Sequence, residues 1–281
     1  MALSNFPIDK SYLIATWLAS AFWGLSCHLY FFSNFDIYPE EPTSKFNQRN
    51  THIALRYTLS TVHISLVLTR IIEAFIVHVG DDGGAISYLA NIGLPLNRSK
   101  DMIYVTTVVM ADTILLWRCL MVWNKNYWVI ALPGLLVLTT AITGYGAIAH
   151  YFLPDPYIPE TVSWAIGMLI TSMATNIIVT ILTAGRIWQL TRRSSLGKSN
   201  IRYNYVILMI IESGLVMAIS KTLEFILFEL APDNGLDGLN ALYIVMDCMP
   251  QIMGICPTAI ILAVNRGFSS DESIGYVPSS K

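Results

Sequence analysis

Long apolar runs separated by short polar segments set the pattern of this chain. A helix that crosses the roughly 30 Å hydrocarbon layer of a bilayer needs about 20 apolar residues, because each residue rises 1.5 Å. Four runs reach that length with at most one charged residue, and three more reach it with several charges. The seven runs lie near Tyr12–Phe32, Ile53–Val79, Met102–Trp123, Tyr127–Leu153, Thr161–Gly185, Tyr203–Leu230 and Ala241–Val264.

The run lengths predict an all-α fold. In lipid only helices and closed barrels satisfy the backbone, and no strand-length alternation of polar and apolar residues competes here. We therefore expect a polytopic membrane protein whose single domain, residues 1–268, is a bundle of seven transmembrane helices. Residues 269–281 are expected to form a short disordered tail. The expected location is the plasma membrane or an endomembrane.

Composition supports lipid as the main partner. Hydrophobic residues make up 54% of the 281-residue chain and charged residues only 13%, and the mean hydropathy is +0.54. A soluble domain carries roughly 25% charged residues, so this chain has too little polar surface to face water on all sides. The net charge of −2 argues against a nucleic-acid partner, which would call for a basic surface.

Basic residues between the runs predict the orientation, because cytoplasmic loops collect Lys and Arg. With the N-terminus outside, the outer segments contain only Lys10, Arg98 and Lys100. The inner segments then contain Lys45, Arg49, Lys125, Arg192, Arg193, Lys198, Arg202, Arg266 and Lys281. We expect the N-terminus outside and the C-terminus in the cytosol. The sequon Asn97-Arg98-Ser99 falls in a predicted outer loop, where it would be glycosylated.

Polar residues recur at helical spacing within the runs, and in lipid such residues turn toward the bundle interior. The stripes comprise Arg56, Ser60, His63, Arg70 and His78 in the second run, Ser172, Asn176, Thr180 and Thr183 in the fifth, and Asp247, Gln251, Gly254, Thr258 and Asn265 in the seventh. In the fourth run, Thr140, Thr143 and Gly144 are small residues that let helices approach closely.

Ionisable residues within the runs are the candidates for chemistry, because a charge at the bilayer centre costs at least about 2.5 kcal/mol and needs a partner. One interpretation is an outward-facing polar pocket. The other is a set of structural pairs, such as Arg70 with Glu73, or Lys221 with Glu224 or Asp247. The proposed ligand-binding residues are Arg70, Glu73, Asp112, Lys221, Glu224, Asp247 and Gln251.

Several familiar sites have no counterpart in the sequence. No His/Cys cluster has the spacing of a zinc site, and no Gly-rich loop would hold a phosphate. The last run has no lysine, which argues against a retinal Schiff base. We therefore expect no metal ion and no cofactor.

Two stretches carry a resemblance. Ala111-Asp112 with Trp117-Arg118-Cys119, and Thr175-Asn176 with Thr183 through Trp188, resemble a large group of functionally uncharacterised membrane proteins from mushroom-type (basidiomycete) fungi. The resemblance extends from about residue 53 onward. It implies seven membrane spans and a fungal origin, and it implies no function.

Two function classes stay open. The favoured one is a receptor-like protein that binds a small lipophilic or polar ligand outside and a cytosolic partner at the basic segment 190–202. The alternative is an intramembrane enzyme similar to seven-span fungal terpene cyclases, in which Glu73, Asp112, Glu212 or Asp247 would protonate a lipophilic substrate. A transporter or channel is a weaker alternative, so enzymatic activity is uncertain and not favoured.

Overall fold

The structure, a computed structural model, describes residues 6–35, 43–153, 159–193, 199–231 and 238–275. Within these residues it is all-helical, with a single β-bridge between Phe6 and Leu239 and no strand. A π-helical turn, η1 (Glu73–Val77), continues the second helix, and α3 (Gly84–Ala90) is short. The long helices are α1 (Ile8–Phe35), α2 (Thr43–Ile72), α4 (Pro95–Val122), α5 (Tyr127–His150), α6 (Pro159–Arg193), α7 (Ser199–Leu230) and α8 (Leu242–Gly275).

Each predicted run falls on one of these long helices, and the all-α expectation is confirmed. Four helical segments of the described residues are long and apolar enough to cross a membrane: Ile53–Val77, Pro95–Val122, Tyr127–His150 and Pro159–Leu190.

Charged side chains lie inside the bundle and large apolar side chains lie outside. Arg70, Asp112 and Asp247 are at most 1% exposed, whereas Trp17 is 71% and Ile181 66% exposed. The predicted polar stripes of α2, α6 and α8 are buried along most of their length, which confirms that they face inward. A water-soluble protein shows the opposite distribution, so this one is compatible with a surrounding bilayer.

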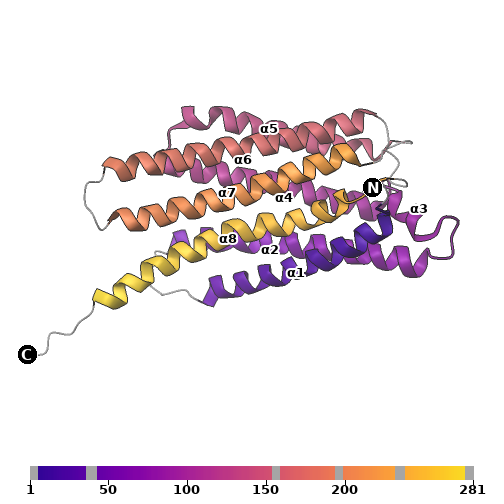
Figure 1. Cartoon of the computed structure of the whole chain (residues 1–281), viewed down its shortest axis with the longest axis horizontal. Helices are drawn as coiled ribbons and strands as arrows, with labels where there is room; N and C mark the ends of the chain where they lie inside the picture. The colour runs from indigo at the N-terminus through magenta and orange to yellow at the C-terminus, as the bar shows by residue number, and fades with distance from the viewer. Residues whose placement is uncertain (1–5, 36–42, 154–158, 194–198, 232–237, 276–281) are drawn as a thin grey trace, which may run out of the picture.

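The helices run side by side along the long axis of the molecule (Figure 1). Helix α4 packs against α2, α5, α6 and α8, while α1 packs against α2 and α8, and α7 against α6 and α8. The end of the bundle at which α1 begins and α3 lies is named the N-terminal end (Figure 1). Helices α4, α6 and α8 begin at this end, and α5 and α7 finish there.

Small residues bring α4, α5 and α6 together, as the sequence predicted. A Cβ atom at Gly144 would lie 2.7 Å from a methyl group of Val105 on α4 and 2.8 Å from the sulfur of Met168 on α6. The Thr140 and Thr171 hydroxyls are 2.9 Å apart across the α5–α6 contact. Only glycine at position 144 allows this separation of the backbones.

Several helices extend past their predicted bounds, and the extensions of α4 and α8 change earlier predictions. Helix α4 begins at Pro95 rather than near Met102, because proline suits the first helical turn, where its missing N–H is not needed. Helix α8 continues to Gly275, so the tail predicted to begin at residue 269 starts within a helix. Extending a formed helix costs little once it is nucleated, and no proline stops it there. Residues 276–281, and residues 194–198 of the basic segment 190–202, lie outside the described residues.

The longer α4 contradicts the prediction made for the sequon. Asn97 lies within the helix rather than in a loop, and it is 1% exposed. Its amide nitrogen, the atom that would carry a glycan, donates to the Ile92 carbonyl and to Asp101. Because this nitrogen is buried and bonded, the sequon does not support the orientation.

Candidate functional site

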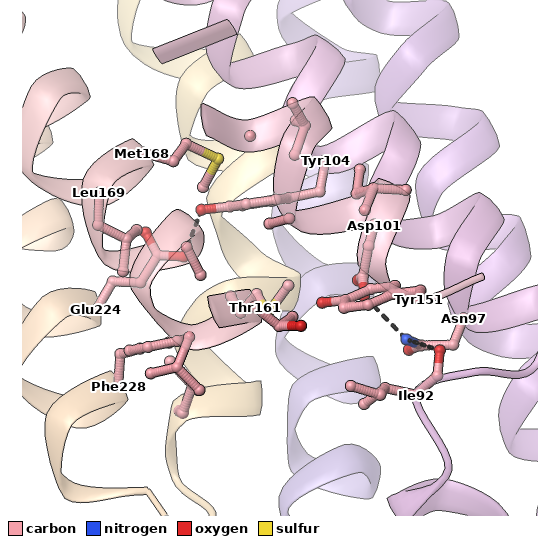
Figure 2. Close-up of a pocket in the computed structure, with 18 of the residues that line it drawn as sticks. Ile92, Asn97, Asp101, Tyr104, Tyr151, Thr161, Met168, Leu169, Glu224 and Phe228 are labelled. Atoms are coloured by element: carbon pink, nitrogen blue, oxygen red, sulfur yellow. Dashed lines mark hydrogen bonds between the residues drawn. The ribbon is translucent and has the colours of Figure 1, made fainter. Parts of the chain in front are cut away.

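A cavity of about 180 Å³ lies near the N-terminal end of the bundle, between helices α4, α5, α6, α7 and α8. Figure 2 shows side chains of α4, α6 and α7 converging on it, together with Tyr151, which follows α5. An apolar cavity of about 150 Å³ is large enough for benzene, so this one is large enough for a small organic molecule. It is smaller than the roughly 300–1,000 Å³ pockets that hold drug-sized ligands.

One stripe of α4 supplies much of the polar wall. Asn97, Asp101 and Tyr104 recur at helical spacing and line the cavity together with the neighbouring Lys100. Asn97 donates to Asp101 over a distance of 2.9 Å, which fixes the carboxylate against the first turns of the helix. The early start of α4 at Pro95 is what places these residues on a helix.

Lys100 is the centre of a buried charge cluster behind this wall. Its Nζ lies 2.9 Å from Oδ1 of Asp101 and 2.9 Å from Oδ1 of Asp247 on α8. The Arg70 guanidinium, on α2, donates to the Tyr12 hydroxyl and to the Leu89 carbonyl, each over 2.7 Å. We name Arg70, Lys100, Asp101 and Asp247 the outer charge cluster. Its two cations balance its two carboxylates.

Glu224 of α7 also lines the cavity, and it has only one hydrogen-bond partner among the described residues. The Tyr104 hydroxyl donates to Oε1 over 2.5 Å, and Figure 2 shows the two side chains meeting at the cavity wall. The other carboxyl oxygen, Oε2, is buried and has no partner. A buried polar atom without a partner costs about 1–3 kcal/mol, and more where the group is charged, so this oxygen would gain from a hydrogen-bond donor placed beside it.

Apart from Thr161, whose hydroxyl is buried without a hydrogen-bond partner among the described residues, the rest of the lining is apolar or aromatic. Tyr151 follows α5, Phe228 belongs to α7 and Tyr243 to α8. Aliphatic side chains complete the wall, among them Val105, Ala147, Ile148, Ala165, Leu169 and Met246. The cavity therefore suits a molecule with one polar group and an apolar body.

A second buried charge pair lies outside the cavity lining. Lys221 of α7 donates to Oδ1 of Asp112 on α4 over 2.9 Å, and also to the Ser172 hydroxyl of α6. Ser172 in turn donates to the other oxygen of Asp112. Three helices are thus joined by one closed set of hydrogen bonds, named the inner triad: Asp112, Ser172 and Lys221.

The structure separates the residues that the sequence proposed as one ligand site. Glu224 lines the cavity. Arg70 and Asp247 belong to the outer charge cluster, and Asp112 and Lys221 to the inner triad. Gln251 donates to the backbone carbonyl of Ser60 over 3.0 Å, across the α2–α8 contact. Glu73 is half-exposed, 3.8 Å from His78.

The expected ion pairs are therefore not the ones that form. Lys221 pairs with Asp112, and Asp247 pairs with Lys100, which the sequence had placed in a loop. Arg70 does not pair with Glu73, because the helix widens into the η1 turn at Glu73 and the three-residue spacing no longer aligns the two side chains. Glu212, one of the acids considered for an enzyme, is exposed.

Sequence reasoning missed most of the cavity wall. The predicted apolar run begins near Met102, which leaves Lys100 and Asp101 in a loop, and nothing in the sequence pattern singles out Tyr104 or Tyr151. A helix started at Pro95 would have aligned Asn97, Asp101 and Tyr104 on one face, so the proline was the usable signal. Among the described residues no group of three His, Cys, Asp or Glu side chains could hold a metal ion.

Comparison with known proteins adds no relative. No protein-family model, curated protein or solved structure matches this chain.

Proposed function

We propose that the chain is a seven-span, receptor-like membrane protein that binds a small amphipathic ligand in the cavity at the N-terminal end. The observation that carries the proposal is the cavity itself, which is lined by five helices, with polar groups on α4, Glu224 with its unpartnered oxygen on α7, and apolar or aromatic side chains over most of the rest. Ligand sites in helix bundles have this composition: mostly apolar, with a few polar groups that orient the ligand.

The cavity volume favours this function over the enzyme. A terpene-cyclase-like reaction needs a chamber for a long isoprenoid chain together with an acid. The cavity of about 180 Å³ is below the volume of pockets for drug-sized ligands. Two of the acids considered for proton donation, Asp112 and Asp247, are each bound to a lysine, so neither is a free acid.

The proposed orientation, with the N-terminus outside, can be tested with reporters. We expect a fluorescent protein fused after Lys281 to face the cytosol, and a sequon in an N-terminal extension to be glycosylated in a eukaryotic host. Asn97 should stay unmodified, because its amide is buried and bonded. A cytosolic N-terminal extension would overturn the orientation, and the cavity would then face the cytosol.

Ligand binding can be tested by filling the cavity. A library of small amphipathic compounds of about ten non-hydrogen atoms is screened for compounds that raise the unfolding temperature of the purified protein. A compound at one hundred times its Kd stabilises the folded state by about 2.7 kcal/mol. We expect Ala165→Phe, which places a ring in the cavity wall, to abolish the shift.

The matched control is Ala131→Phe, because Ala131 is exposed on α5 and does not line the cavity. This variant should respond to the same compounds as the parent. If no compound shifts the parent, or if Ala165→Phe responds equally, the cavity is not a ligand site and the proposed function fails.

A further inference from the structure

We propose that the ligand of this cavity is a small organic amine, bound as its cation by Glu224 and the surrounding aromatic rings. The inference rests on the proposed function and specifies its ligand class. It follows from the balance of buried charges, the free oxygen of Glu224 and the aromatic lining of the cavity.

The buried charges leave Glu224 without a cation of its own. Arg56 lines a separate small cavity, to which Glu224 does not contribute. The other buried charged side chains of the described residues are Arg70, Lys100 and Lys221 against Asp101, Asp112, Asp247 and Glu224. Lys100 pairs with Asp101 and Asp247, and Lys221 pairs with Asp112. The Arg70 guanidinium is bound to the Tyr12 hydroxyl and the Leu89 carbonyl. Glu224 is the carboxylate that remains.

Lysines near the cavity cannot take the place of a ligand cation. Lys221 is one helical turn from Glu224, but its Nζ donates to Asp112 and Ser172. Lys100 lines the cavity, but its Nζ contacts two carboxylates at 2.9 Å each. The same contacts argue against an acidic ligand, because the ammonium that would bind an anion is already paired.

Geometry at Glu224 suits an ammonium group. The residue lines the cavity and is 2% exposed, and its Oε2 atom is buried without a hydrogen-bond partner in the described part of the chain. The rings of Tyr104, Tyr151 and Phe228 line the same space (Figure 2). Aromatic faces attract organic cations, and the attraction is stronger where water is excluded. A carboxylate beside several rings therefore selects a cation with an apolar body.

Cavity size limits that body. The volume of about 180 Å³ accepts little more than the benzene held by an apolar cavity of about 150 Å³. A phenyl ring on a short alkylamine meets this limit, so 2-phenylethylamine is a suitable probe. Its neutral and anionic counterparts, 2-phenylethanol and phenylacetate, have nearly the same shape and differ in charge.

The experiment measures the shift in unfolding temperature of the full chain with each of the three probes near pH 7. We expect 2-phenylethylamine to bind most tightly and phenylacetate to give no shift. Glu224→Gln keeps an acceptor for the Tyr104 hydroxyl but removes the charge. It should raise the apparent Kd for the amine about 30-fold or more, as loss of one partner of a buried charge pair does.

Two further variants separate recognition from folding. Glu229→Gln removes an exposed carboxylate from the same helix and should leave all three shifts unchanged. Tyr104→Phe keeps the ring and removes the hydroxyl that occupies Oε1 of Glu224, so it should bind the amine more tightly than the parent does. If any substitution in the cavity wall weakened amine binding, Tyr104→Phe would bind the amine less tightly than the parent. That result would contradict the role assigned to the Glu224 carboxylate.

Each other outcome has a definite meaning. If 2-phenylethanol or phenylacetate binds as tightly as the amine, or if Glu224→Gln binds the amine like the parent, the amine inference is overturned while the ligand site stands. If Ala165→Phe reduces the unfolding-temperature shift of none of the probes or library compounds, the proposed function itself fails.

Discussion

Lys221→Met should lower the stability of the bundle by about 3–5 kcal/mol, because removing one partner of a buried ion pair leaves the other charge without compensation. Here the stranded group is Asp112, which is fully buried and would keep only the Ser172 hydroxyl. The unfolding temperature in detergent should fall by roughly 6–15 °C.

Removing both charges should restore much of the loss. In the double variant Lys221→Met/Asp112→Asn no charge remains in the inner triad, and the asparagine oxygen can still accept from Ser172. Replacement of a whole buried pair is often near neutral. The double-mutant cycle should therefore give a coupling energy of more than about 1 kcal/mol, in the range found for contacting residues.

Surface variants of the same chemistry serve as controls. Lys10→Met and Asp82→Asn change exposed side chains, and each should shift the unfolding temperature by less than about 2 °C. Strictly additive losses at Lys221 and Asp112 would mean that the two residues are not partners in the folded protein.

The helices and their inward faces could be predicted from the sequence because both depend on local patterns. A run of about 20 apolar residues leaves the backbone no alternative to a helix in lipid. The spacing of Ser172, Asn176 and Thr183 puts them on one face of α6, and all three are buried. The Gly144 contact followed in the same way from residue size.

The partners of the buried charges could not be predicted from the sequence, because they depend on how helices far apart in the sequence are placed. Asp112 and Lys221 belong to α4 and α7, and nothing in either run shows that these helices lie close enough to pair. The sequence showed that Lys221 needed a carboxylate, and Glu224 was the nearest along the chain. Three-dimensional packing brought Asp112 closer.

The position at which α4 begins determines which residues form the polar wall of the candidate site. Hydropathy marked Met102 as the start of a span, because Lys100 and Asp101 interrupt the apolar run. The structure starts α4 at Pro95 and places both charged residues inside the bundle, where they neutralise each other. A hydropathy value depends only on residue type, so it is the same for a charge paired inside a bundle and for a charge in a loop. The polar wall of the cavity could therefore not be predicted from composition.

Lys100→Met should have the largest effect of any single substitution in the outer charge cluster. The ammonium compensates Asp101 and Asp247 together, so its removal leaves two buried carboxylates with only Arg70 nearby. We expect a loss of at least about 3–5 kcal/mol, the value for breaking a single buried pair.

Asp247→Asn should cost less, because Lys100 keeps Asp101 as a partner at 2.9 Å. Adding Asp247→Asn to Lys100→Met should recover stability, since Arg70 then faces one carboxylate instead of two. The expected order of unfolding temperatures in detergent is therefore parent, Asp247→Asn, the double variant and, lowest, Lys100→Met. If Asp247→Asn lowered the unfolding temperature as much as Lys100→Met, the two carboxylates would not share Lys100. Asp101 would then contribute nothing to stabilising the buried Lys100 ammonium.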